Sequence, residues 1–288
     1  MSGTMSTTTT TRFMPPLGLG TWHMGERGAD AKSEAAAIRH AIELGYRLFD
    51  TAEMYGSGGA ESVLGEAIDA AMRAGDVKRD ELIVVSKVLP SNADTKGVVA
   101  ACERSRARLK LDTIDLYLLH WRGGVPLANT LRGFEMLLQR GWIARWGVSN
   151  FDASDMRELE SLGDVSGQRC TANQVWYSLG QRGPGFELLP SMQQRGIELM
   201  AYCPLDEGRL ASHRGLQDFA RTKGATASQV ALAWLAAQSG VAAIPKSSNL
   251  ERLRENLASL EVELSADDLT QLDKLFPPPR KAAGLAMV

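Results

Sequence analysis

The sequence predicts a single-domain (β/α)8 barrel of the α/β class. Short apolar segments alternate with helical segments along the 288 residues, and such alternation implies parallel strands joined by right-handed helical crossovers. The strand-like segments are continuously apolar, which is typical of a sheet covered on both faces. Eight such units match a closed barrel, which commonly has about 250 residues in one domain. We expect the barrel to span residues 13–280, between a flexible N-terminal tail at 1–12 and a C-terminal tail at 281–288.

Each expected strand is a run of apolar residues bounded by polar or turn residues. In chain order the runs are Leu17–Thr21, Arg47–Phe49, Leu82–Val85, Ile114–Leu119, Ile143–Val148, Thr171–Val175, Ile197–Ala201 and Val241–Ile244. Helical patterns lie between them at Ala31–Leu44, Ala60–Ala74, Thr95–Leu109, Ala128–Gln139, Ala153–Leu162 and Ser228–Gln238. Glycines that suit a left-handed helix C-cap follow helices at Gly45, Gly75, Gly141, Gly196 and Gly240.

An open, doubly wound sheet is the competing architecture. It would normally carry Gly-x-Gly-x-x-Gly after the first strand to bind a dinucleotide. Here Gly18-Leu-Gly-Thr-Trp-His lacks the third glycine, and Pro15 and Pro16 precede it. The closed barrel is therefore favoured.

The composition bounds the partners and the compartment. A net charge of −2 and a pI near 6.1 give no reason to expect nucleic acid or an anionic membrane as partner. Cys102, Cys170 and Cys203 have unrelated spacings, which argues against a disulfide framework and fits a reducing cytoplasm. No apolar run approaches the roughly 20 residues that span a bilayer. The Ser/Thr-rich N-terminus lacks the apolar core of a secretory signal, and Met5 offers a second start.

Polar side chains stand at or just past the ends of three successive expected strands. Asp50 and Tyr55 follow the second strand, Lys87 the third and His120 the fourth. In an α/β barrel the C-terminal ends of the strands carry the chemistry. Singly, Asp50 has an alternative interpretation as a helix cap, Lys87 as a surface ion-pair partner and His120 as a hydrogen-bonded core residue. Together, the acid, phenol, ammonium and imidazole predict a proton-transfer site.

These four residues resemble the catalytic residues of the aldo-keto reductases. The resemblance covers nearly the whole chain, through Gly18–Trp22, Gly147–Phe151 and Ile244–Ser247. It implies that Tyr55 is the general acid in carbonyl reduction and the general base in alcohol oxidation. It also implies NADPH/NADP+ as the cofactor, and a monomer.

The residue types suit that chemistry. A tyrosine hydroxyl has a reference pKa of about 10 and is a weak acid unaided. We expect the ammonium of Lys87 to lower the pKa of Tyr55 and Asp50 to pair with Lys87 and orient it. His120 would donate to the substrate carbonyl oxygen or relay the proton.

Three polar residues follow the fifth and sixth expected strands. Ser149, Asn150 and Gln174 would bind a carboxamide through hydroxyl and amide groups, with loop capping as the alternative for Asn150. By resemblance, Tyr202 is the tyrosine that stacks on the nicotinamide ring.

The segment after Tyr202 is less regular than in the family. Pro204 and Leu205 match a segment whose backbone contacts the pyrophosphate, but Cys203 stands where many members have serine. Any hydroxyl contact from that position is lost. We expect Cys203 to be a core residue and not a nucleophile.

A cationic segment follows the last expected strand. Phosphate sites on barrels often use these loops and a helix N-terminus. Lys246, Ser247 and Arg252 match the family's binders of the adenosine 2′-phosphate, and Glu255 and Asn256 match its adenine contacts. Two clustered cations favour NADPH over NADH. The alternative is an ordinary amphipathic helix with solvated charges.

Aromatic residues near the strand ends are candidates for the substrate pocket. Trp22 resembles the family's pocket tryptophan, with His23, Met24 and Trp121 as further candidates. Packing between loops is the alternative for all four. The local motifs are most similar to bacterial members of the methylglyoxal-reductase type, and the segment after His120 is short. We therefore expect an open pocket for small aldehydes and dicarbonyls such as methylglyoxal.

Two other functions stay open at this stage. The same fold serves as a nicotinamide-sensing regulatory subunit with weak or no turnover. A barrel hydrolase or aldolase would use Lys87 as a Schiff base, but that lysine would need desolvation and the 2′-phosphate segment would be unexplained. No ligand cluster suggests a metal site, and the expected reaction requires none. The barrel hosts many chemistries, so the fold alone does not decide the function.

Overall fold

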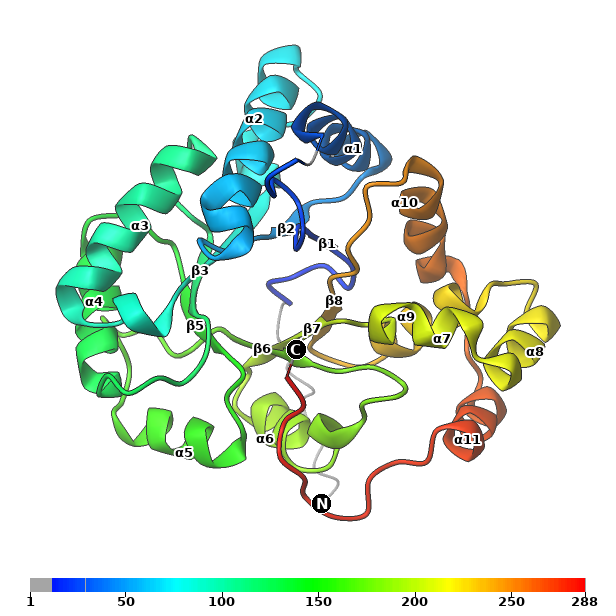
Figure 1. The fold of residues 1–288 in the computed structure, drawn as a ribbon. Helices are drawn as coiled ribbons and strands as arrows, with labels where there is room; N and C mark the ends of the chain where they lie inside the picture. Colours follow the sequence, from blue (N-terminus) through cyan, green and yellow to red (C-terminus); the bar gives the residue numbers. More distant parts are fainter. Residues whose placement is uncertain (1–11, 29, 288) are drawn as a thin grey trace, which may run out of the picture.

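The computed structural model describes residues 12–28 and 30–287. Eight parallel strands form one sheet in sequence order, with each strand beside its neighbours in the chain (Figure 1). The strands are β1 (Leu19–Gly20), β2 (Leu48–Asp50), β3 (Ile83–Val88), β4 (Leu116–Leu119), β5 (Trp146–Ser149), β6 (Ala172–Trp176), β7 (Glu198–Tyr202) and β8 (Val241–Ala243).

The two edges of the sheet meet and close the barrel. The amide of Gly18 donates to the carbonyl of Ala243 at 2.8 Å, and the amide of Ala243 donates to Pro16 at 2.9 Å. Parallel bridges join Leu17 to Ala243 and Gly20 to Lys246. The predicted (β/α)8 barrel is confirmed, and the open sheet is excluded.

Helices surround the barrel. They are α1 (Ala31–Leu44), α2 (Gly59–Ala74), α3 (Thr95–Leu109), α4 (Leu127–Gln139), α5 (Ala153–Ser161), α6 (Leu188–Gln194), α7 (Arg209–Ser212), α8 (Arg214–Thr222), α9 (Ala227–Ala236), α10 (Leu250–Leu257) and α11 (Ala266–Leu275). The bounds of α1 and α3 are those predicted, and the other four predicted helices agree within two residues at each end. The sequence patterns give no bounds for α6, α7, α8, α10 and α11, each of which has ten residues or fewer.

Three predicted strands begin too early. Leu17 lies two residues before β1 and forms an isolated bridge to Ala243. Ile114 and Ile143 form an isolated bridge to each other, and the ladders of β4 and β5 start two and three residues later. Apolar character extends beyond the paired residues here because the side chains of Ile114 and Ile143 are buried before the ladders begin.

Apolar side chains fill the barrel and leave one end open. The interior cluster includes Leu48, Val85, Leu118 and Met200, with Met14 packed against them from the segment before β1. The amide of Met14 donates to the carboxylate of Glu198, the first residue of β7, at 3.0 Å. Because Glu198 begins a strand, Met14 closes the N-terminal end of the barrel. The C-terminal end is left for a cavity.

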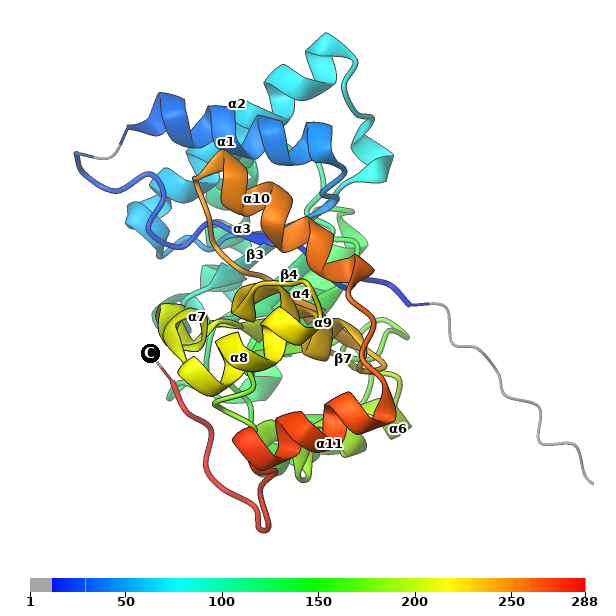
Figure 2. The same ribbon diagram turned by 90° about the vertical axis from the view of Figure 1, so that its right-hand side faces the viewer.

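The last described residues reach that open end. From α11 the chain runs across to the face seen in Figure 1, and Figure 2 shows it on the side opposite the start of the described chain at Arg12. The predicted N-terminal tail lies almost wholly in residues 1–11, outside the described residues. Within the described ranges, no helix has the length and apolar character needed to cross a membrane.

Gly59, the first residue of α2, allows the loop between β1 and α1 to lie against that helix. A Cβ on Gly59 would lie 2.0 Å from the carbonyl oxygen of Gly25, and φ at Gly59 is an ordinary −62°. We expect Gly59→Ala to destabilise the fold by about 1–3 kcal/mol. The Gly25 oxygen belongs to the backbone, so it cannot avoid the added methyl group by a change of side-chain rotamer. Thermal unfolding measures the loss. Gly124→Ala is the matched control, since nothing lies within 4 Å of its Cβ. Equal unfolding temperatures for the two variants would contradict this account.

Candidate active site

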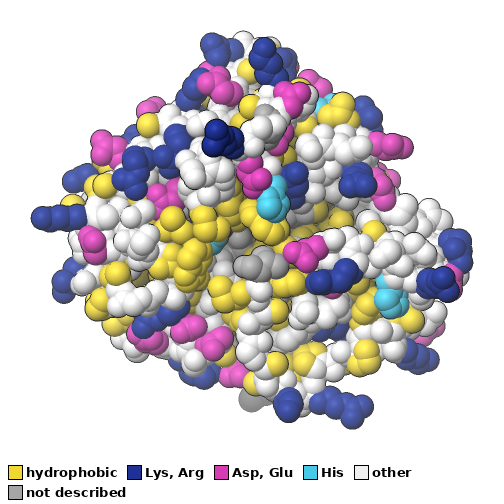
Figure 3. Space-filling view, viewed as in Figure 1, with side chains coloured by type: hydrophobic (Ala, Val, Ile, Leu, Met, Phe, Trp, Pro, Cys, Tyr) yellow, Lys and Arg dark blue, Asp and Glu magenta, His cyan; other side chains and the backbone are white. Residues whose placement is uncertain are grey.

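A cavity of about 810 Å³ opens at the C-terminal end of the strands. Figure 3 shows the hollow in the centre of this face, with hydrophobic side chains gathered around it. Every predicted site residue except Lys87 and Met24 lines the cavity. These residues are Trp22, His23, Asp50, Tyr55, His120, Trp121, Ser149, Asn150, Gln174, Tyr202, Pro204, Leu205, Lys246, Ser247, Arg252, Glu255 and Asn256. The chain thus brings together both predicted ends of a dinucleotide site.

Lys87 lies directly behind the cavity wall. Asp50 pairs with Val85 in the sheet register, so Lys87 stands two residues further along β3 and projects from the same face. Its Nζ donates to Oδ2 of Asp50 at 2.8 Å, to the carbonyl of Thr51 at 2.8 Å and to the hydroxyl of Tyr55 at 3.2 Å. Three acceptors match the three N–H groups of an ammonium. Lys87 is therefore the charged partner of Asp50.

Tyr55 begins a tight 3₁₀ turn, Tyr55–Gly58, after β2. The turn brings its ring beneath Lys87, with Nζ 4.7 Å from the ring centroid, and beside His120 at 5.7 Å between centroids. Burial raises the pKa of Tyr55 well above 10, and the Asp50 carboxylate raises it further. The expected lowering of the Tyr55 pKa is wrong for this site, because burial and the nearby Asp50 carboxylate raise that pKa. The phenol holds its proton at neutral pH.

His120 follows β4, and a hydrogen bond from its backbone amide holds it in place. Its amide donates to the carbonyl of Val88 at 3.0 Å, and its side chain is largely buried. Burial and the charge on Lys87 hold the pKa of His120 well below its ordinary value. The imidazole is therefore neutral at neutral pH. Its Nδ1 is buried without a hydrogen-bond partner among the described residues.

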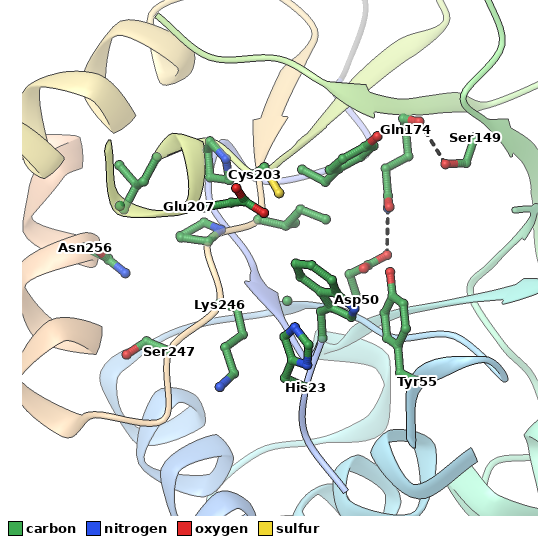
Figure 4. A pocket seen from close by; sticks show the side chains of 18 of the residues that line it. His23, Asp50, Tyr55, Ser149, Gln174, Cys203, Glu207, Lys246, Ser247 and Asn256 are labelled. Atoms are coloured by element: carbon green, nitrogen blue, oxygen red, sulfur yellow. Dashed lines mark hydrogen bonds between the residues drawn. The ribbon is translucent and has the colours of Figure 1, made fainter. Parts of the chain in front are cut away.

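The three predicted carboxamide ligands meet at the ends of β5 and β6. The Ser149 hydroxyl donates to the backbone carbonyl of Gln174 at 2.9 Å (Figure 4). Asn150 donates to the carbonyl of His120 at 3.2 Å and accepts from the Tyr202 hydroxyl at 2.9 Å. These contacts fix one wall of the cavity through backbone and side chain together.

The far end of the cavity is cationic. Lys246 and Arg252 are exposed, and neither forms an ion pair with a carboxylate of the described residues. Asn249 caps α10 by accepting from the Arg252 amide at 3.0 Å. Glu255 on the same helix accepts from the Thr226 hydroxyl at 2.6 Å. Two unneutralised cations beside a helix N-terminus suit a phosphate group.

Several cavity residues depart from the sequence predictions. Met24 is wrong as a rim candidate, because its side chain is fully buried in the core. Cys203 lines the cavity instead of the core, and burial raises the pKa of its thiol to about 11. Met54, Glu207 and Met287 also line the cavity and were missed. Of these, only Met54 could have been suggested by its position in the sequence, because it directly precedes Tyr55.

Residues 16–276 match the model described as the Aldo/keto reductase family. The chain belongs to this family. As an aldo/keto reductase it is an oxidoreductase. It is 45% identical over 280 residues to methylglyoxal reductase YeaE of Escherichia coli K12, covering 96% of this chain and 95% of that one. It is 34% identical to glyoxal reductase of Bacillus subtilis, covering 91% of this chain and 89% of that protein.

Solved structures of aldo/keto reductases have the same architecture. An aldo-keto reductase from Klebsiella pneumoniae in complex with NADPH superposes with a TM-score of 0.89. The two chains are 44% identical, and the match covers 96% of this chain and 95% of that one. The similarity therefore extends over the whole barrel.

Proposed function

We propose that this aldo/keto reductase uses NADPH to reduce small aldehydes and dicarbonyls, methylglyoxal among them, to alcohols. One observation carries the proposal: a single cavity joins a protonated phenol, Tyr55, to two free cations, Lys246 and Arg252. A dinucleotide with an extra phosphate has a reacting ring toward one end and the added charge toward the other, which matches these two groups. The names of the E. coli and B. subtilis relatives support methylglyoxal and glyoxal as the type of substrate.

The residues that would hold the cofactor divide into groups along the cavity. Lys246, Ser247 and Arg252 would bind the 2′-phosphate, and Glu255 and Asn256 would contact the adenine. Ser149, Asn150 and Gln174 would bind the carboxamide, Tyr202 would face the nicotinamide ring, and the backbone of Pro204 and Leu205 would lie along the pyrophosphate. When bound, NADPH supplies the hydride that reduces the carbonyl carbon.

The proton comes from the chain itself. Tyr55 would donate its proton to the carbonyl oxygen, and the adjacent Lys87 would stabilise the phenolate that remains. Asp50 keeps Lys87 charged and in place through the 2.8 Å contact. His120, which is neutral, would donate a hydrogen bond to the same carbonyl oxygen and position it. Trp22, His23 and Trp121 would form the walls around the substrate, with the apolar character common in such pockets.

The same geometry weighs against a Schiff-base enzyme. Burial desolvates Lys87 and lowers its pKa, as such an enzyme would require. A nucleophilic lysine also needs a lone pair, however, and all three N–H groups of the Lys87 ammonium have acceptors. A nicotinamide-sensing role without turnover would not require the proton donor that Tyr55 provides. We further propose that the enzyme acts as a monomer, as the family resemblance implies, and in the cytoplasm, which its three unpaired cysteines support.

The pH dependence should differ between the two reaction directions. Because burial and Asp50 raise the pKa of Tyr55, the phenol stays protonated through neutral and mildly alkaline pH. The single-turnover rate of reduction should therefore be flat from about pH 6 to about pH 9. Alcohol oxidation needs the phenolate, so its rate should rise with pH over the same range. A reduction rate that falls steeply between about pH 7 and about pH 9 would contradict the assignment.

The function is tested by following NADPH absorbance with purified protein and a panel of small aldehydes and dicarbonyls. Consumption of NADPH with methylglyoxal, and with related small carbonyls, is expected. Tight binding of NADPH without turnover on any member of the panel would favour the sensing role. No binding of NADPH would overturn the cofactor assignment at Lys246–Asn256.

A further inference from the structure

Gln174 makes a hydrogen bond across the inside of the barrel. Its Nε2 donates to Oδ1 of Asp50 at 2.7 Å, between residues 124 positions apart (Figure 4). Asp50 ends β2 and Gln174 lies in β6, and these strands are four places apart in a closed eight-stranded sheet. Both side chains are almost fully buried. The contact therefore joins opposite walls of the barrel.

With this contact, both carboxylate oxygens of Asp50 accept a hydrogen bond. Its Oδ2 accepts from Lys87 at 2.8 Å and its Oδ1 accepts from Gln174 at 2.7 Å. One charged donor and one neutral donor thus hold the two oxygens. Rotation of the carboxylate away from Lys87 would break both hydrogen bonds. Gln174 therefore constrains the direction from which Asp50 meets the lysine.

The contact also fixes what Gln174 presents to the cavity. Its backbone carbonyl accepts from the Ser149 hydroxyl at 2.9 Å and from the Asn150 amide at 2.8 Å, which holds the residue in place. Because the carboxylate requires a donor, the NH₂ end of the amide turns toward Asp50. The carbonyl Oε1 has no hydrogen-bond partner among the described residues and is left to accept from a ligand. One side chain thus faces both the predicted carboxamide site and the acid that supports Lys87.

We propose that Gln174 is a positioning residue for proton transfer, which holds Asp50 against Lys87 and links the carboxamide site to the group that faces Tyr55. This inference rests on the proposed function and adds a second task to a residue expected only to bind cofactor. Without the neutral donor, the buried carboxylate would draw a proton more strongly. Lys87 would then lose its charged partner, and the Tyr55 phenolate would lose its support.

Two variants separate this task from cofactor binding. Gln174→Met keeps the length of the side chain but removes the N–H donor. Gln174→Glu places a second carboxylate beside Asp50, where two like charges share a proton and raise its affinity. We measure the single-turnover rate of carbonyl reduction at saturating NADPH against pH, with NADPH affinity determined separately by fluorescence titration. Thermal unfolding verifies that both variants fold.

At saturating NADPH, Gln174→Met should reduce the rate about tenfold or more. It should also add a loss of rate at acidic pH that wild type lacks, and Gln174→Glu should move that loss to higher pH. Tyr177→Phe is the control for the loss of a hydrogen-bond donor outside the site, since its hydroxyl donates to Gln238 and does not line the cavity. It should leave both NADPH binding and the shape of the pH profile unchanged.

A Gln174→Met variant with weaker NADPH binding, but with the wild-type rate and pH profile at saturation, would overturn the proposal. Gln174 would then be a cofactor ligand alone. Turnover by wild type in the same assay reports on the proposed function, whereas the difference between the wild-type and variant profiles reports on Gln174. The two results are therefore read independently.

Discussion

Tyr55→Phe should lower the single-turnover rate of aldehyde reduction by about 10²–10⁴-fold, the usual contribution of a positioned acid or base. The phenyl ring keeps the shape of the cavity wall and loses only the hydroxyl that lies 3.2 Å from Nζ of Lys87. Lys87 retains Asp50 and the Thr51 carbonyl, so the charged pair stays in place. Binding of NADPH should change little, because the hydroxyl is not among the groups assigned to the cofactor. Stopped-flow oxidation of NADPH measures the rate.

Tyr177→Phe is the matched control for the loss of a tyrosine hydroxyl. Tyr177 is buried away from the cavity, and its hydroxyl donates to Gln238 at 2.7 Å. Its removal should cost about 0.5–1.5 kcal/mol of stability, as for a typical hydrogen bond, and leave the rate of reduction unchanged. If Tyr55→Phe reduced aldehydes as fast as the control, Tyr55 would not be the proton donor.

Replacing both Lys246 and Arg252 with alanine should weaken NADPH binding by about two orders of magnitude and leave NADH binding nearly unchanged. Charge-assisted hydrogen bonds to a phosphate contribute about 1.5–3 kcal/mol each, and solvent exposure places these two near the lower value. Because both side chains are exposed, the difference should shrink as ionic strength rises. Fluorescence titration with each dinucleotide at low and high salt measures the ratio of affinities.

Arg254→Ala is the control for that pair. Arg254 is also an exposed cation on α10, but it does not line the cavity. It should change the affinities for NADPH and NADH equally and slightly. If the Lys246 and Arg252 substitutions weakened binding of NADPH and NADH equally, these cations would not bind the 2′-phosphate.

Local signals explain why the sequence predicts much of the fold. The bounds of α1 and α3 follow from capping residues that interact with residues only a few positions away. The side chain of Asp30 accepts from the Ser33 amide and caps α1, and Gly45 ends that helix in the left-handed conformation. Asp94 caps α3 in the same way. Such contacts reach only a few residues along the chain and are visible in the sequence.

The positions of the strand-end residues were equally accessible to sequence reasoning. Parallel strands in a barrel point their C-terminal ends the same way, so Asp50, Lys87 and His120 had to meet once their strands were identified. Their detailed interactions were not accessible in this way. The depth of burial, which reverses the expected shift in the pKa of Tyr55, depends on the whole barrel.

The remaining features that the sequence did not predict depend on contacts between distant segments. The Gln174–Asp50 hydrogen bond joins residues 124 positions apart, and no pattern in either segment indicates it. Glu207 and Met287 reach the cavity through the path of the loop after β7 and of the C-terminal segment. Met24 turns into the core although it directly follows two cavity residues, Trp22 and His23. Loop paths are set by tertiary packing, which the sequence did not reveal here.

We expect this enzyme to reduce a carbonyl with a hydride from NADPH bound in the cavity. The most direct test uses NADPH deuterated at the reactive carbon of the nicotinamide ring, with methylglyoxal as substrate and mass spectrometry of the product. We predict one deuterium on the new alcohol carbon and none when protein is omitted. An alcohol product without deuterium, or bound NADPH that is never oxidised by any small carbonyl, would contradict the account.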